Sequence, residues 1–114
     1  MPDRGRPYVS LRPSRRFATV YDTGASVRVG GIKVIRAAGS PGLPEVGIVA
    51  TRRVGNAVWR NRAKRRIREA LHFTDLLPDS AYIVVASSSS ATTSFDQLVG
   101  SLSEAIAIVN EESR

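Results

Sequence analysis

The residues of this chain best suited to chemistry form a dense run of arginines and lysines. Eight of the 17 basic residues lie between Arg52 and Arg68. A guanidinium presents a planar set of donors that matches phosphate oxygens, and a series of them can follow a phosphate backbone. A charge run is often only a solvated, salt-bridged surface. Glu69 is the only acidic residue beside this run, so we interpret the run as a phosphate-binding surface.

The run is predicted to lie on a helix of about residues 57–73, with Asn56 as its N-cap. At about 100° per residue, one face of this helix is apolar and the opposite face is basic. Trp59 lies on the apolar face, and we interpret it as a core residue, with stacking on RNA as the alternative. Arg60 and Lys64 flank the apolar stripe. The basic face consists of Asn61, Arg62, Arg65, Arg68 and His72.

The charge of the whole chain also favours a polyanionic partner. The formal net charge is +7; residues 1–68 carry a net +13 and residues 69–114 a net −6. Arginine outnumbers lysine fifteen to two. Nucleic acid is the commonest partner of such a distribution.

Several chemical classes are disfavoured by what the sequence contains. The chain has no cysteine and a single histidine, His72, so it offers no thiol chemistry and no histidine cluster for a metal. We therefore predict neither a catalytic residue nor a metal site in the chain. No apolar run is long enough to span a membrane, and the basic N-terminus does not lead into a signal-peptide core. These observations favour a cytoplasmic protein without membrane contact.

The elements that must position the basic run follow from hydrophobic periodicity. A helix over about residues 13–23 would place Phe17, Val20 and Tyr21 on one side. Core packing of this helix is the simpler explanation of that spacing. The other expected elements are four strands near residues 27–29, 32–36, 46–50 and 81–86, and a final amphipathic helix after a capping box at Ser94 and Gln97.

This order of elements predicts an α/β fold, a two-layer α+β sandwich. Its mixed four-stranded sheet and three helices would follow the order α-β-β-β-α-β-α. We expect residues 1–12 to be a flexible basic arm, residues 13–110 a single RNA-binding α/β domain, and residues 111–114 a C-terminal tail.

The stretch from Arg52 to Arg68 resembles the signature of the bacterial ribonuclease P protein family. That signature is a basic pair, Gly-Asn-Ala-Val, one variable residue, Arg-Asn-Arg, one residue, Lys-Arg, two residues and Arg. The chain matches it at every fixed position, with Trp59 at the variable one. The resemblance covers roughly residues 11–109, including the aromatic pair Phe17 and Tyr21.

The resemblance implies a left-handed β-α-β crossover, which composition and spacing do not predict because such crossovers are usually right-handed. It also implies two RNA-binding surfaces. The residues that would contact the catalytic RNA subunit are Arg60, Asn61, Arg62, Lys64, Arg65 and Arg68. The residues that would line a cleft for the single-stranded 5′ leader of precursor tRNA are Phe17, Tyr21, Arg52 and Arg53. Ser87 stands where the family usually has a basic residue beside the leader path, which puts leader contacts there in question.

The function implied by the resemblance is that of the protein subunit of ribonuclease P, an endoribonuclease that removes the 5′ leader of precursor tRNA. Catalysis is expected in the RNA subunit, with Mg²⁺ held by RNA rather than by the protein. The expected partners are ribonuclease P RNA and the precursor leader, with no obligate protein partner. The alternative is a general RNA-binding or ribosome-associated protein without precursor-tRNA specificity. A helix-turn-helix DNA reader is disfavoured because a strand, not a helix, precedes the basic helix.

Overall fold

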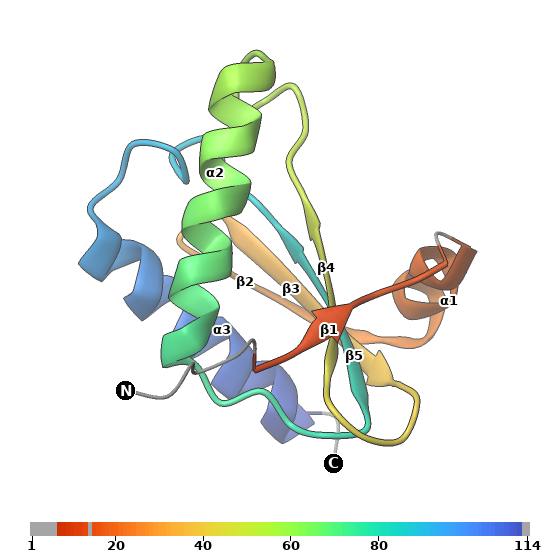
Figure 1. Ribbon diagram of the computed structural model, residues 1–114. Coiled ribbons are helices and arrows are strands. Elements are labelled where there is room, and N and C mark those ends of the chain that lie inside the picture. The colour runs from red at the N-terminus through yellow and green to blue at the C-terminus, as the bar shows by residue number, and fades with distance from the viewer. Residues whose placement is uncertain (1–6, 14, 113–114) are drawn as a thin grey trace, which may run out of the picture.

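A five-stranded mixed sheet forms the centre of the computed structural model, which describes residues 7–13 and 15–112 (Figure 1). The strand order across the sheet is β1-β4-β5-β3-β2. In chain order the elements are β1 (Val9–Ser10), α1 (Arg15–Thr23), β2 (Ala25–Val29), β3 (Ile32–Ala38), β4 (Glu45–Val49), α2 (Ala57–Ala70), the short 3₁₀ helix η1 (Leu71–Phe73), β5 (Ser80–Val85) and α3 (Phe95–Glu112).

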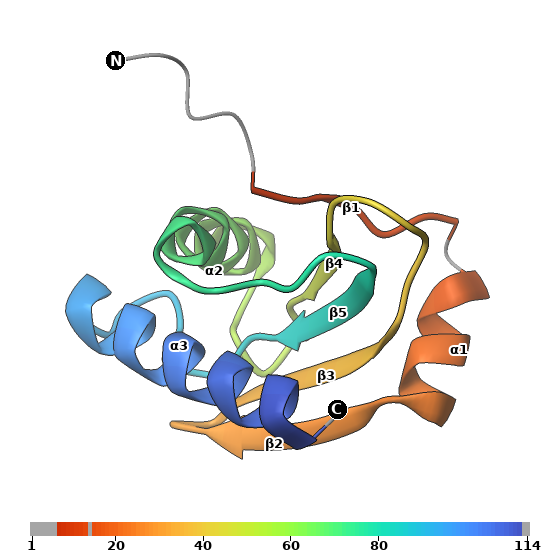
Figure 2. The ribbon, with the colours of Figure 1, turned by 90° about the horizontal axis from the view of Figure 1, so that it is seen from below.

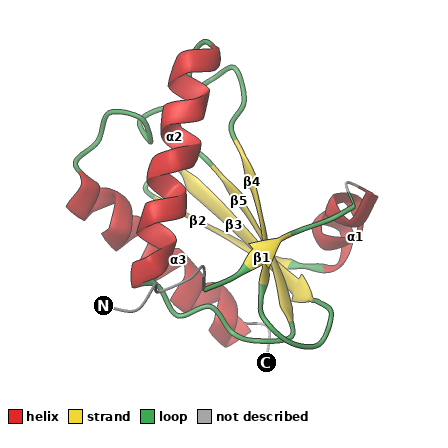
Figure 3. Ribbon diagram, viewed as in Figure 1, coloured by secondary structure: helices red, strands yellow, loops and turns green. Residues whose placement is uncertain are grey.

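The helices lie on opposite faces of the sheet. Helices α2 and α3 cover one face, and α1 lies alone against the other (Figures 2 and 3). Alternate residues of each strand therefore enter two separate cores. The larger core, under α2 and α3, contains Val34, Tyr82 and Val84; the smaller core, under α1, contains Ile35 and Ile83.

The sequence prediction of an α/β domain with three helices is confirmed, but the number of strands is wrong. The fifth strand, β1, lies inside the segment predicted to be a flexible arm, and it pairs in parallel with β4. Tyr8 and Leu11, on either side of β1, are each only 4% exposed. Two paired residues are too few to show an alternating pattern, so the signal was absent from the sequence. Residues 1–6 of the predicted arm lie outside the described residues.

The connection from β4 through α2 to β5 links two parallel, adjacent strands. Figures 1 and 2 together show that this connection is left-handed: the chain leaves β4, passes over one face in α2, and returns to β5 with the hand opposite to the usual one. This topology places the start of α2 directly after the C-terminal end of β4, at one end of the sheet.

Both long helices begin where their capping residues predict. Asn56 Oδ1 accepts a hydrogen bond from the backbone N–H of Trp59 at 3.2 Å, and Ser94 Oγ accepts one from Gln97 N–H at 3.2 Å. Helix α3 continues to Glu112, so it extends into the segment predicted as a tail.

Candidate nucleic-acid interface

The solvent-facing side of α2 carries a group of basic side chains without protein partners. Arg65 and Arg68 are exposed, and so is Asn61, which lies nearer the start of the helix. None of the three has a hydrogen-bond or ion-pair partner within residues 7–13 and 15–112. In that part of the chain the only ion pair joins Arg16 to Glu45. The donors of these side chains are therefore not used within the described part of the chain.

Two other arginines of α2 donate hydrogen bonds to backbone oxygens of the protein. Arg66 Nη1 donates to Ser90 O at 2.8 Å, and its Nη2 donates to Thr93 O. Arg62 Nε donates to Ala91 O at 2.8 Å. Both side chains thus hold the loop between β5 and α3 against the helix. Arg62, predicted to bind RNA, has its Nη groups left for that purpose, whereas Arg66 has a structural role that the sequence analysis did not identify.

Arg60 is also partly committed to the protein. Its Nη1 donates to the backbone oxygen of Gly55 at 2.9 Å, across the turn that starts α2. Lys64, the other residue predicted on the flank, is half-buried and has no partner among the described residues. The six residues predicted to contact the RNA subunit therefore share one helix, but they differ in how many donors they leave to solvent.

Ser87 stands at the position where the family resemblance led us to expect a basic residue, and its side chain does not take over that role. Ser87 is buried, its N–H donates to Ser90 Oγ at 2.9 Å, and its hydroxyl contacts the same Oγ at 2.9 Å. The side chain is thus directed into the loop. It offers no charge to a ligand on the sheet rim.

The aromatic pair of α1 divides between the core and the surface. Phe17 is half-buried with its ring over Gly47 of β4, where an added Cβ would overlap the ring. Val20 is fully buried, as predicted, and Tyr21 is 45% exposed. One edge of α1 is therefore packed on the sheet, while the other offers an aromatic ring to solvent.

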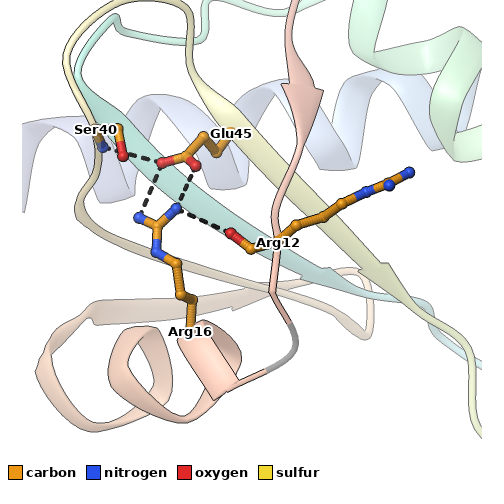
Figure 4. Close-up of polar contacts among 4 residues, drawn as sticks. All are labelled: Arg12, Arg16, Ser40 and Glu45. Carbon is orange, nitrogen blue, oxygen red and sulfur yellow. Dashed lines mark hydrogen bonds and ion pairs between the residues drawn. The ribbon is translucent and has the colours of Figure 1, made fainter.

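An ion pair fixes α1 to the sheet (Figure 4). Arg16 donates to both carboxylate oxygens of Glu45, one of them at 3.0 Å, and Ser40 N–H donates to the same carboxylate at 3.0 Å. The hydrogen bond from Arg16 lowers the pKa of Glu45, and the same bond raises the pKa of Arg16. Glu45 is therefore ionised at neutral pH, and this contact sets the position of Phe17 and Tyr21.

Beyond α1, the same sheet face carries an open row of side chains. Val49, Val85, Lys33 and Arg28 are register partners across β4, β5, β3 and β2. The two valines are half-buried, Lys33 is half-buried and Arg28 is exposed. The row thus combines an apolar floor with a cationic end. Lys33 and Arg28 were missed by the sequence analysis because they became neighbours of this surface only through strand register.

Arg52 and Arg53 lie in the turn that follows β4, and both side chains are exposed and have no hydrogen-bond or ion-pair partner among the described residues. Arg53 lines a hollow of about 280 Å³ together with Arg28, Val85 and Ser88. The structure therefore brings Arg53 beside Arg28 and Val85 of the open row. Phe17 packs over Gly47, two residues before Val49 on β4, and Tyr21 extends from the same helix into solvent.

Trp59 does not occupy the core, contrary to our interpretation of the sequence. Its side chain is 43% exposed at the edge of α2, although it points toward the same side as Ala63 and Ile67. The first turn of α2 extends past the end of the sheet, so little protein is available there to cover an indole. His72, at the other end of the helix, is exposed as expected.

No cluster of three or more histidine, aspartate or glutamate side chains that could hold a metal is found within the described residues. In the same part of the chain, no helix combines the length and apolarity needed to cross a membrane. The acidic residue nearest the basic surface along α2 is Glu69, which makes no ion pair among the described residues.

Comparison with known proteins relates this geometry to one family. The family described as Ribonuclease P matches residues 6–110. A ribonuclease P protein component from Shouchella clausii is 35% identical over 96 residues, which cover 81% of this chain and 78% of the relative. One from Brucella suis is 38% identical over 71 residues; that match covers 60% of this chain and spans half the length of the relative. The structure of Staphylococcus aureus RNase P protein superimposes with a TM-score of 0.74 at 27% identity, covering 87% of this chain and 93% of the other.

Proposed function

The chain belongs to the ribonuclease P protein family, and we propose that it acts in tRNA 5′ maturation by binding both the catalytic RNA and the 5′ leader of precursor tRNA. Family membership makes it a subunit of an RNase P endoribonuclease. The proposal adds which surface binds which RNA and assigns catalysis to the RNA subunit.

The observation that carries the proposal is the separation of two different surfaces on one small domain. Helix α2 presents unpaired cations on a rigid rod, which suits the regularly spaced phosphates of a folded RNA. The α1 face presents an aromatic ring, an apolar floor and a few cations, which suits unstacked bases and the backbone of a single strand. A protein that bound RNA through charge alone would not need the second surface.

The proposed assignments follow these surfaces. Arg65, Arg68 and Asn61 would make the main contacts to the RNA subunit, with Arg60, Arg62 and Lys64 supplying their remaining donors. Phe17 and Tyr21 would contact bases of the leader, and Arg52 and Arg53 its phosphates. We add Lys33 and Arg28 to the leader surface, because they supply charge on the rim where Ser87 supplies none.

The reaction promoted would be hydrolysis of the phosphodiester bond that precedes the mature 5′ end of tRNA. Mg²⁺ held by the RNA would supply activation of the attacking water and stabilisation of the leaving oxygen. The protein would hold the leader near the ribozyme and offset the repulsion between two polyanions. It should therefore lower the concentration of Mg²⁺ that the reaction requires.

The test is cleavage of a precursor tRNA by a bacterial ribonuclease P RNA at low Mg²⁺, with and without this protein. Correct 5′ cleavage only in the presence of the protein is the expected result. Tight RNA binding without any effect on cleavage would instead favour a general RNA-binding protein. A second substrate without a leader separates these outcomes, since a leader-binding subunit improves binding of the precursor more than that of mature tRNA.

A further inference from the structure

Trp59 is an exposed aromatic side chain inside the most basic segment of the molecule. It is the only tryptophan of the chain and is 43% exposed. Burying an indole is strongly favourable, and a domain of this size has apolar cores in which to bury one. A tryptophan left at the surface therefore suggests contact with something outside the chain.

The backbone around Trp59 holds the indole in place. A Cβ added to Gly55 would lie 3.1–3.3 Å from Cβ, Cδ1 and Cγ of Trp59, so the base of the side chain rests closely against this glycine. Asn56 caps the Trp59 N–H, and Arg60 is bonded to the Gly55 oxygen. The ring is thus carried by a turn fixed on both sides, which limits the entropy lost when a ligand stacks on it.

The charges around Trp59 favour an RNA ligand over a protein. Arg62 follows one turn later on α2, and the preceding turn carries Arg52 and Arg53. No acidic residue lies between position 46 and Glu69. The indole N–H has no hydrogen-bond acceptor within the described residues. An aromatic plane among cations is the arrangement that binds an unstacked base and its neighbouring phosphates.

We propose that the indole of Trp59 is a stacking platform for an unpaired base of the RNA subunit. This inference rests on the proposed function, because it assumes that α2 faces that RNA. Trp59 lies immediately before Arg60 and one turn before Arg62 on α2, so a base on the indole and phosphates on these two arginines would belong to one RNA surface at the start of the helix. Arg65 and Arg68 project from the other side of the same helix. The platform adds affinity for an RNA that exposes a base at this point, which phosphate contacts alone cannot provide.

The single tryptophan makes the proposal directly measurable. Titration of the full-length protein with ribonuclease P RNA should quench the tryptophan fluorescence, because a stacked base is in contact with the ring. Trp59→Ala should weaken RNA binding by roughly five- to 150-fold, the range of one base–aromatic stack. Trp59→Phe should retain most of the affinity, whereas Trp59→Leu, which is apolar without a π face, should behave like the alanine variant.

Leu43→Ala is the matched control, because Leu43 is an exposed apolar residue outside α2 and is 57% exposed. It should bind the RNA subunit like the wild type. Thermal melts of all variants identify any loss of folding, and the fluorescence titration of the wild type tests stacking without a substitution.

The stacking role of Trp59 would be overturned if the wild type bound the RNA tightly without a change in tryptophan fluorescence and Trp59→Ala bound it equally tightly. The proposed function would remain intact in that case. Failure of the wild type to bind the RNA subunit would overturn the proposed function itself. If quenching requires a precursor leader added to the assembled complex, the base belongs to the leader, and the assignment to the RNA subunit is wrong.

Discussion

Replacing Arg65 and Arg68 together with alanine separates RNA binding from folding. Both side chains are exposed and have no partner among the described residues. Their removal should change the free energy of unfolding by no more than about 0.5 kcal/mol per site. If each arginine neutralises one phosphate of the RNA subunit, the slope of log K against log salt concentration should decrease by about 0.7–0.9 per residue.

The expected effect is large enough to measure. For two contacts the slope changes by about 1.4–1.8, so between 50 and 200 mM salt the wild type should lose roughly seven- to twelvefold more affinity than the double variant. The assay is equilibrium binding of labelled ribonuclease P RNA over that salt series, with a thermal melt of each protein. Identical slopes for the two proteins would refute the assignment of these residues to the RNA surface.

Arg66→Ala is the matched control from the same helix turn. Arg66 donates to the backbone oxygens of Ser90 and Thr93, so its loss should destabilise the fold by about 1.5–3 kcal/mol. For a domain of this size, that corresponds to a decrease in Tm of roughly 6–12 °C. Below its melting range, the variant should keep the salt slope of the wild type. A reduced slope would show that Arg66 also contacts phosphate.

Three further outcomes are expected. Phe17→Ala should weaken binding of precursor tRNA to the assembled complex more than binding of mature tRNA; equal losses would indicate a folding defect. Lys33→Ala should lower the salt slope for the precursor by about 0.7 and leave that for mature tRNA unchanged, which binding at several salt concentrations can check. Glu45→Gln removes the charge that pairs with Arg16 and should cost about 1–3 kcal/mol at pH 7. Because this pair lowers the pKa of Glu45, the stabilisation is complete above the unfolded pKa of about 4.3 and is lost as the pH falls through the lower folded value. Melts from pH 7 to pH 2 should therefore show wild type and variant converging in acid, and a constant difference would contradict the role of the ion pair.

The parts of the fold that were predictable are those with a local signal. The start of α2 at Asn56 and of α3 at Ser94 follow from capping chemistry, and the buried strands follow from apolar runs. The two residues of β1 carry no such signal, since their pairing depends on the backbone of β4. The left-handed crossover has no local signal at all and came only from the family resemblance.

The positive charge of the candidate site was predictable from the sequence, but which arginines bond to the protein and which remain free was not. Residue type marked Arg62, Arg65 and Arg66 alike as basic, and helical position placed Arg62 and Arg65 on the same face. Only the path of the loop at residues 87–93 determines that Arg62 and Arg66 donate hydrogen bonds to carbonyl groups. Trp59 was misplaced for a related reason. Helical periodicity gives the direction of a side chain, but it does not show where the opposing layer ends.

Under the proposed function, helix α2 has two roles with opposite requirements: it packs against the fold and it concentrates cations for RNA. The many cationic side chains of α2 repel one another, and none of them forms an ion pair among the described residues that would reduce this repulsion. The fold offsets part of it by giving Arg60, Arg62 and Arg66 neutral carbonyl acceptors, while Arg65 and Arg68 stay without partners. A polyanion bound to the free face would remove the remaining repulsion. RNA binding should thus raise the melting temperature of the protein in two ways: through the phosphate contacts themselves and through relief of the repulsion within α2. The second contribution should disappear in high salt, where that repulsion is already screened.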